Sequence, residues 1–116
     1  MTRTNFRMED FKNISMIRGD TVSFGIEIAD GDGKPIDINS AFFTVKKNYS
    51  DVSNIFQKKL NNGITKQKSG EYVVRIAPED TASEELGQYF YDFQIGVGSD
   101  IYTMLRGIFE IEWEVS

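Results

Sequence analysis

Carboxylates and aromatic rings are the side chains of this sequence whose spacing could support chemistry. His and Cys are both absent from the 116 residues. Their absence removes the usual general base, the commonest metal ligand and the thiol nucleophile. The chain has no Gly-rich phosphate loop, and its Ser and Thr residues have no His to activate them. We therefore expect no catalytic residue, no cofactor and no enzyme activity.

Three aspartates, Asp30, Asp32 and Asp37, lie in and just after the Gly-rich segment DGDGKP. Their spacing resembles a small calcium loop, but an EF-hand needs a third ligand before the Gly and a Glu further along the chain. Asp is also common in turns, because its carboxylate binds nearby backbone N–H groups. We interpret these residues as turn residues and assign no metal site, with calcium binding as the alternative.

Three glutamates near the end of the sequence, Glu110, Glu112 and Glu114, alternate with apolar residues. In a β-strand this spacing places all three on one face, opposite the apolar side chains. A solvated outer face is one interpretation, and an electrostatic contact with a basic partner surface is the other. A carboxylate pair of a glycoside hydrolase would need a cleft, which nothing in the sequence indicates.

Four aromatic residues, Tyr89, Tyr91, Tyr102 and Trp113, are candidates for a sugar-stacking platform. We assign most of them to a core face, since large rings pack well on half-buried strands. Tyr102 falls on the opposite face from its two neighbours in the alternating pattern. The sequence therefore predicts that Tyr102 is the most exposed of these rings.

The residues from 87 to 116 contain the strongest structural signal of the sequence. Two alternating runs meet at Gly98-Ser99-Asp100, which predicts an antiparallel hairpin with one buried face. The residues predicted on that face are Tyr89, Tyr91, Phe93, Ile95, Val97, Ile101, Thr103, Leu105, Phe109, Ile111, Trp113 and Val115.

Shorter alternating runs and frequent turn signals fill the rest of the chain. Extended segments are expected at 14–17, 21–29, 36–38, 41–47, 54–60 and 71–77, and Pro78 suits the first position of a brief helix. The segment 54–60 is rich in Gln and Lys, which is typical of a sheet edge. Together these signals predict an all-β, immunoglobulin-like or Greek-key antiparallel β-sandwich of seven to eight strands with one short helical connection.

One domain, residues 13–116, is expected to follow an N-terminal arm of residues 1–12. The arm carries three spaced apolar residues, Phe6, Met8 and Phe11, and we expect them to dock on a neighbouring subunit of a homo-oligomer. Deleting the arm should then weaken assembly and leave the fold intact. The net charge of −5 disfavours nucleic-acid binding, and no apolar run approaches the ~20 residues of a membrane span.

Five motifs of the sequence, taken together and in order, resemble the small β-sandwich domain of tailed-phage and prophage structural proteins. That domain is similar to the N-terminal domain of upper-baseplate and tail-fibre proteins. The motifs are Gly19-Asp20-Thr21, Asp32-Gly33 followed by Pro35-Ile36-Asp37-Ile38, Pro78-Glu79-Asp80-Thr81, Gly87-Gln88-Tyr89-Phe90-Tyr91-Asp92 and Thr103-Met104-Leu105-Arg106-Gly107-Ile108-Phe109.

This resemblance implies a stand-alone adaptor or assembly subunit of a phage-like particle. Larger baseplate proteins carry further segments after this domain, so the resemblance does not extend to a receptor-binding head. The implied partners are other tail or baseplate proteins, and the implied location is a virion component made in the bacterial cytoplasm. The alternative function is a carbohydrate-binding β-sandwich that uses Tyr102 and nearby rings.

Overall fold

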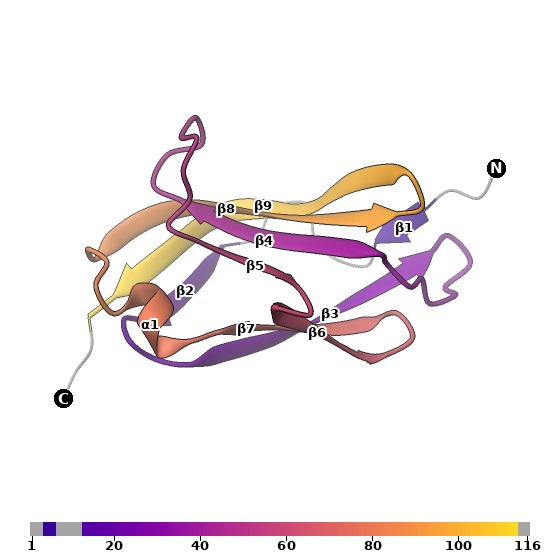
Figure 1. Cartoon of the computed structure of the whole chain (residues 1–116), viewed down its shortest axis with the longest axis horizontal. Coiled ribbons are helices and arrows are strands. Elements are labelled where there is room, and N and C mark those ends of the chain that lie inside the picture. Colours follow the sequence, from indigo (N-terminus) through magenta and orange to yellow (C-terminus); the bar gives the residue numbers. More distant parts are fainter. Residues whose placement is uncertain (1–3, 7–12, 114–116) are drawn as a thin grey trace.

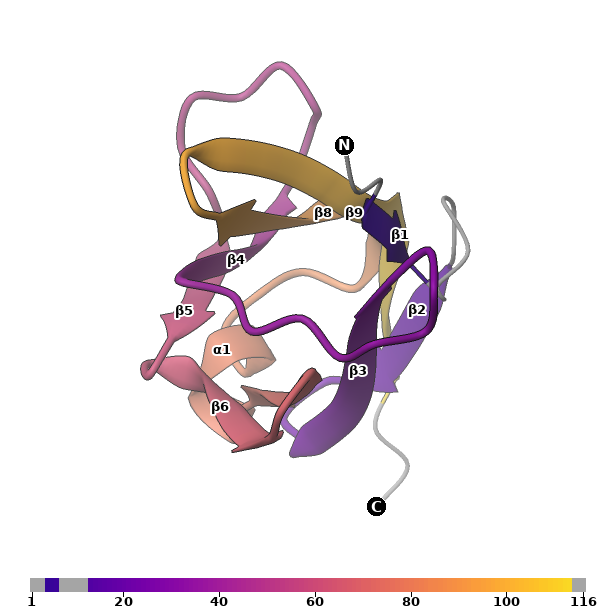
Figure 2. The same ribbon diagram turned by 90° about the vertical axis from the view of Figure 1, so that its right-hand side faces the viewer.

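A computed structural model of the chain describes residues 4–6 and 13–113 and shows two β layers packed face to face (Figure 1 and Figure 2). One short helix connects the layers at one end. The elements are β1 (Thr4–Phe6), β2 (Ile14–Ile17), β3 (Val22–Asp30), β4 (Ser40–Lys46), β5 (Phe56–Leu60), β6 (Gly63–Lys68), β7 (Glu71–Ile76), α1 (Pro78–Thr81), β8 (Gly87–Val97) and β9 (Asp100–Glu112).

The hydrogen-bonded order of the strands is β1-β3-β7-β6-β5-β4-β8-β9-β2. Only two parallel residue pairs join β5 to β6, and this junction divides the strands into a layer β1-β3-β7-β6 and a layer β5-β4-β8-β9-β2. The chain changes layer after β1, β2, β3, β5 and β7, and β2 runs parallel to β9 at the far edge. The predicted immunoglobulin-like β-sandwich is confirmed.

Two strands of the structure differ from the sequence-based expectation. β1 lies within the predicted arm and pairs with β3 of the same chain, and β6 occupies a segment in which no strand was expected. The alternation in β6 is hidden because Ile64 is its single buried residue and Thr65–Lys68 are all exposed and polar. Segment 36–38, expected to be extended, lies outside the strands.

The β8–β9 hairpin forms where the alternating pattern predicts it. Gly98 and Ser99 form a two-residue loop, and Gly98 has a φ of 62°. This positive φ at the first loop position fits a type II′ turn, whose twist matches that of the flanking strands. Tyr89, Tyr91 and Phe93 all point into the core, as predicted.

A β-bulge interrupts the alternation of β9. Phe93 pairs with Leu105, but the next residue of β8, Gln94, pairs with Thr103 and leaves Met104 as an extra residue. Met104 and Leu105 are consecutive and both buried. An extra residue in one strand reverses the faces of all side chains on one side of it.

The bulge overturns several predicted side-chain positions. Ile101 is 64% exposed and Thr103 is exposed, although both were assigned to the core face. Tyr102, predicted to be the most exposed ring, is instead half-buried and packs against the core. Trp113, also assigned to the core, is 71% exposed because β9 ends one residue before it.

An aromatic cluster holds the two layers together. Phe43 of β4 is fully buried, and its ring centroid lies 5.5 Å from that of Phe24 and 5.4 Å from that of Tyr91. The rings of Phe56 and Phe109 complete the cluster. Antibody-type domains place a disulfide and a Trp at the centre of the sandwich. This chain has no Cys, and packed rings occupy its centre instead.

Side-chain hydrogen bonds fix the connection that contains α1. Asp80 accepts a hydrogen bond from the N–H of Ala77 at 2.7 Å and forms an ion pair with Lys58 of β5 at 2.6 Å. The hydroxyl of Tyr89 donates to the carbonyl of Glu85 at 2.7 Å, in the manner of the tyrosine corner of immunoglobulin-like domains. The predicted helical connection is thus confirmed. It is anchored to β5 through Lys58 and to β8 through Tyr89.

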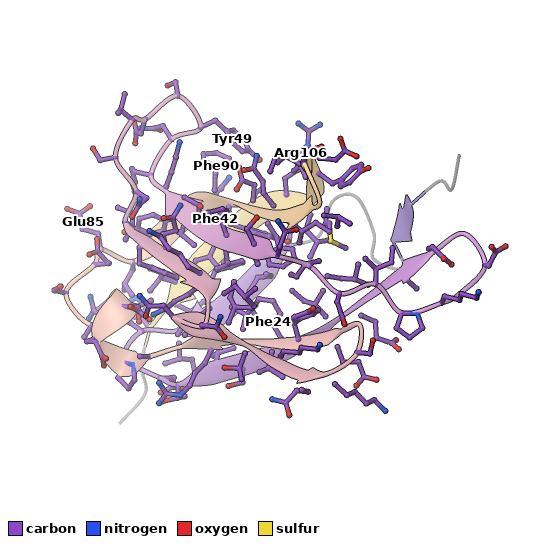
Figure 3. The ribbon with its side chains drawn as sticks, turned by 45° about the vertical axis from the view of Figure 1, so that its right-hand side comes forward. Phe24, Phe42, Tyr49, Glu85, Phe90 and Arg106 are labelled. Carbon is purple, nitrogen blue, oxygen red and sulfur yellow. The ribbon has the colours of Figure 1, made fainter. Side chains whose placement is uncertain are left out.

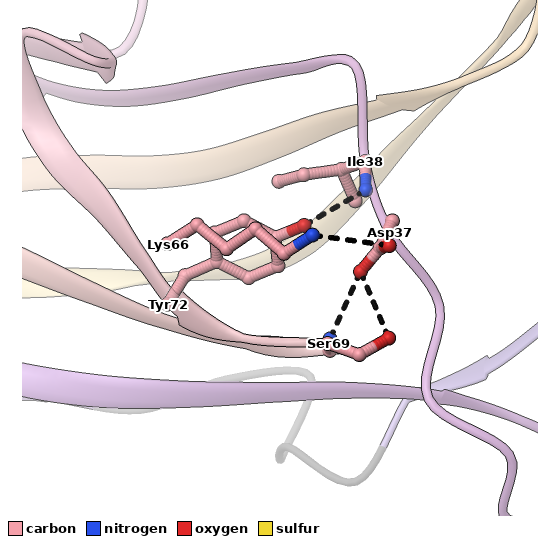
Figure 4. Close-up of polar contacts among 6 residues, drawn as sticks. Asp37, Ile38, Lys66, Ser69 and Tyr72 are labelled. Atoms are coloured by element: carbon pink, nitrogen blue, oxygen red, sulfur yellow. Dashed lines mark hydrogen bonds and ion pairs between the residues drawn. The ribbon is translucent and has the colours of Figure 1, made fainter.

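A second polar cluster ties the segment after β3 to the β6–β7 turn (Figure 4). Asp37 accepts hydrogen bonds from the hydroxyl of Ser69 at 3.1 Å and the N–H of Gly70 at 3.2 Å, and it pairs with Lys66 at 3.1 Å. Beside it, the buried hydroxyl of Tyr72 accepts a hydrogen bond from the N–H of Ile38 at 3.0 Å. These contacts close one end of the sandwich.

Replacing Tyr72 with Phe tests this cluster. The substitution leaves the N–H of Ile38 buried without its acceptor, and we expect a loss of about 1–3 kcal/mol in the free energy of unfolding. Urea denaturation of the two proteins measures the change. Tyr49→Phe is the control, because that ring is 54% exposed, and it should change stability by less than about 0.5 kcal/mol. Equal effects of the two substitutions would contradict the assignment.

Candidate functional site

The outward side of the layer β5-β4-β8-β9-β2 is the candidate functional surface, and we call it the outer face. Its strands place alternate residues toward solvent, and a loop after β4 lies over one side of it (Figure 3). The side chains that define the outer face are Phe42, Thr44, Lys46, Tyr49, Gln88, Phe90, Asp92, Gln94, Arg106, Ile108 and Glu110.

Two rings of the outer face stack on each other. The centroids of Tyr49 and Phe90 lie 4.3 Å apart with 32° between the ring planes. Tyr49 is 54% exposed, and Phe90 and Phe42 are half-buried on the solvent side of their strands. The open side of an antiparallel sheet is ordinarily polar. Aromatic rings at these positions are typical of the centre of a protein–protein interface.

A half-buried carboxylate lies next to these rings. Asp92 of β8 stands between Thr44 of β4 and Arg106 of β9 in the strand register. Among the described residues, no hydrogen bond or ion pair reaches its carboxylate. Burial raises the pKa of Asp92, and nearby Lys46 lowers it by a smaller amount. The fold therefore holds a carboxylate on the outer face at a cost in stability.

This cost predicts a pH-dependent effect of Asp92→Asn. A carboxyl group with a raised folded-state pKa contributes its full stability below its unfolded pKa and loses it as pH rises through the folded pKa. The unfolded value is near 3.8, so the substitution should leave stability unchanged near pH 3 and raise it at pH 7 by less than about 1 kcal/mol. Urea unfolding at several pH values measures this change.

The comparison for this experiment is Asp37→Asn, whose effect has the opposite sign. The hydrogen bond from Lys66, followed by that from Gly70, lowers the pKa of Asp37. Its contribution is present above the unfolded pKa of 3.8 and is lost as pH falls through the folded pKa. Asp37→Asn should therefore destabilise the protein at pH 7 and have less effect in acid. Parallel pH profiles for the two variants would contradict both assignments.

The residues predicted to form an interaction surface do not converge. Glu110 and Glu112 are exposed on β9, as predicted, and Glu110 belongs to the outer face. Tyr102 points inward, and its hydroxyl lies 3.5 Å from Asp100. Phe6 ends β1, but its side chain, together with Met8, Phe11 and Glu114, lies outside the described residues.

The aspartates of the Gly-rich segment form a turn, as interpreted from the sequence. The carboxylate of Asp30 accepts hydrogen bonds from the N–H groups of Asp32 at 2.9 Å and Lys34 at 3.0 Å. Asp37 is occupied by its own cluster with Lys66. Within residues 4–6 and 13–113, no three His, Cys, Asp or Glu side chains are grouped so that they could hold a metal ion.

The buried phenol of Tyr91 is a poor acid–base group. Burial, with a smaller contribution from Tyr49, raises its pKa to about 12. It therefore stays neutral at physiological pH and supplies neither a base nor a nucleophile. In the described part of the chain, no helix has the length and apolar character needed to cross a membrane.

Sequence reasoning missed the pair Tyr49–Phe90. The signal for Phe90 was present, because an aromatic residue occupies the outward phase of β8. Phe42 shows the same pattern on β4. No sequence pattern pointed to Tyr49, because it lies in a loop. The loop folds so that Tyr49 contacts Phe90 of β8, about forty residues later in the chain.

Comparison with known proteins identifies the fold. No family model matches the chain, and no curated protein matches it. Titin domain M7 is similar in structure, with a TM-score of 0.50 and 9% identity over 96% of this chain and 95% of that chain. The structure of the four N-terminal Ig domains of Dscam1 isoform 7.44 is similar over 96% of this chain and 25% of that chain, with a TM-score of 0.50 and 11% identity. At these identities the likeness shows the fold alone, an immunoglobulin-like β-sandwich.

Proposed function

We propose that this protein is a non-enzymatic docking module that binds other proteins of a phage or prophage tail or baseplate. The observation that carries the docking role is the stacked ring pair on the outer face, exposed Tyr49 on half-buried Phe90, beside the half-buried Phe42. Aromatic residues are enriched in interfaces because they bury a large area at a low entropy cost. The outer face would bind a partner through these rings, with its charged residues fixing the orientation.

The resemblance to small phage β-sandwich domains supports the tail or baseplate assignment. The residues that carry it set turns and core faces of this fold: Pro78–Thr81 forms α1, and Tyr89 and Tyr91 point into the core from β8. Its motifs include no catalytic residue, which agrees with a docking role. The proposed partners are neighbouring tail or baseplate proteins and further copies of this chain, in a virion component made in the bacterial cytoplasm.

Co-purification with the products of neighbouring genes tests this proposal. The tagged chain is co-expressed with each tail or baseplate protein that is encoded beside it, and retained partners are identified by mass. We expect at least one to bind, and Phe90→Ser to weaken that binding at least tenfold because it removes half of the stacked pair. Thr65→Ala, an exposed change on the opposite layer, is the matched control. If the chain binds none of these proteins, the proposal is ruled out.

Carbohydrate binding is the second candidate function, and one observation favours it. Tyr102 no longer supports it, because that ring packs against the core. Tyr49 offers an exposed ring of the kind that stacks on sugars, although its other side is covered by Phe90. A glycan array with the wild-type chain and Tyr49→Ala separates the two functions. Binding that depends on Tyr49 would favour the carbohydrate role, and no binding at millimolar sugar would remove it.

A further inference from the structure

We propose that the outer face binds a second copy of this chain in a two-fold symmetric dimer, in which Tyr49 of each protomer occupies a hollow on the other. This inference rests on the proposed docking function and names one of its partners. Three features of the outer face lead to it: a raised ring on one side, a hollow on the other at the same height, and an acidic and a basic side chain one outward pair further along β8 and β9.

The raised ring is Tyr49. The loop that carries it rises from the end of β4 and projects beyond the layer (Figure 1 and Figure 3). Contacts within the loop hold its shape, because the carboxylate of Asp51 accepts the N–H of Asn48 at 3.0 Å and the N–H of Asp51 donates to the carbonyl of Asn48 at 3.1 Å. Stacking on Phe90 fixes the ring itself. A ring already held in place loses little entropy on binding, which favours its use as an anchor.

The hollow lies across the same face, over β9 and β2. Its lining residues are Asn13, Ile14, Ser15, Gln88, Ile108 and Glu110. Ser15 lies opposite Glu110 in the register, and its small side chain leaves the space between Ile108 and the edge strand open. Four of these residues are polar, and Ile14 and Ile108 are apolar, so the hollow offers an inserted phenol ring both apolar contact and hydrogen-bond partners.

The strand register relates the ring and the hollow. Phe90, under Tyr49, pairs with Ile108, which lines the hollow, so the two features lie at the same height along the strands. A two-fold axis parallel to the strands and midway between β8 and β9 places β8 over the partner's β9 and the start of the loop after β4 over its β2. With strands ~4.8 Å apart, this operation carries Tyr49 of each protomer to the hollow of the other.

The same axis pairs the charges of the outer face. Asp92 and Arg106 are register partners on β8 and β9, so exchanging these strands sets Asp92 opposite the partner's Arg106, twice in the dimer. Among the described residues, neither side chain has an ion pair, and Asp92 is half-buried. A dimer thus gives each charged group an opposite charge across the interface, in addition to its register partner in the same chain.

The size of the outer face fits a weak dimer. In this dimer β8 and β9 overlap over the eleven paired positions of the hairpin, which at ~4.8 Å between strands covers about 360 Å² per protomer before the Tyr49 loop is added, against about 800 Å² in a standard stable interface. Two layers of this kind pack about 10 Å apart with their strands about 30° from parallel, which agrees with an axis along the strands. We expect a reversible dimer whose population depends on protein concentration.

Sedimentation velocity from about 1 µM to about 1 mM tests the dimer directly. The wild-type chain should shift from monomer to dimer in this range, and Tyr49→Ala should raise the dissociation constant at least tenfold. Circular dichroism and urea unfolding establish that each variant is folded. A wild-type chain that remains a monomer throughout overturns the inference, and so does a dimer that Tyr49→Ala leaves unchanged.

A charge exchange tests the geometry of the interface. Asp92→Arg and Arg106→Asp each place like charges opposite one another in their own dimer, so each variant alone should be monomeric. Mixed in equal amounts, the two variants restore both opposite-charge pairs and should form a heterodimer. Arg75→Asp, an exposed change on the opposite layer, is the matched control and should dimerise like the wild type. A mixture that stays monomeric, or single variants that dimerise normally, contradicts this interface.

The dimer and the proposed function fail separately. A chain that dimerises through Tyr49 and ignores every tail or baseplate protein would refute the proposed function and leave the dimer standing. A monomer that still captures such a protein through Phe90 would refute the dimer and leave the docking role standing.

Discussion

Phe43→Ala should lower the free energy of unfolding by about 3–5 kcal/mol, the largest effect of any single change that we expect in this protein. Phe43 is fully buried, and its ring contacts those of Phe24, Tyr91, Phe56 and Phe109. Removing it leaves a cavity between the two layers that the surrounding rings cannot close without shifting both sheets. A domain of this size is stable by about 5–15 kcal/mol, so the variant loses a large share of its stability.

Urea denaturation followed by tryptophan fluorescence or circular dichroism measures the effect of Phe43→Ala. Phe42→Ala is the matched control, because Phe42 is the neighbouring residue on the same strand and is half-buried on the opposite face. It should cost less than about 1.5 kcal/mol, since it removes the same atoms from a partly solvated site. A larger loss from Phe42→Ala than from Phe43→Ala would mean that the buried side of β4 is misassigned.

Gly70→Ala is the second change for which we expect a large effect. Gly70 lies in the β6–β7 turn with a φ of 75°, in the left-handed region that disfavours any side chain. A Cβ at this position would lie 2.7 Å from Cβ of Pro35 and 2.8 Å from the carbonyl oxygen of Ile28. Ile28 is held in place, because its N–H donates to the carbonyl of Gly70 itself at 2.8 Å.

The substitution should therefore destabilise the protein by more than about 2 kcal/mol, as measured by urea denaturation. Gly98→Ala separates the cost of the left-handed backbone conformation from the cost of the close contacts. Gly98 has a φ of 62°, but among the described residues nothing lies within 4 Å of the position that a Cβ would take. This variant should lose only the ~1 kcal/mol of the left-handed conformation. If both variants lost the same stability, the close approach of Pro35 and Ile28 to Gly70 would have no energetic weight.

Sequence patterns that extend over only a few residues correctly predicted the strand, turn or helix in which they lie. Alternation over β8, the Gly98 turn and the Pro at the start of α1 each act over a few residues, and all three are found as expected. The extended segment expected at 41–47 is also found as β4, with Phe43 and Val45 buried and Phe42 on the other side. A side chain's face follows from strand geometry alone as long as the strand is regular.

The candidate site was less predictable from the sequence. The bulge at Met104 reversed the faces of Ile101 and Tyr102, because an extra residue changes the phase of a strand without changing its residue types. The strand β6 was missed because it turns only Ile64 toward the core. The ring pair Tyr49–Phe90 depends on how a loop folds back, which no periodic pattern records.

The sequence by itself determined the β-sandwich and the lack of any histidine or cysteine chemistry, because both follow from residue types and short-range alternation. The tertiary structure alone decided which side chains share a surface. Tyr49, Phe90 and Asp92 meet through the path of a loop, and Asp92 faces Arg106 through the register of two strands. Such contacts join residues distant in the chain, so they follow from the packing of the whole molecule rather than from local pattern.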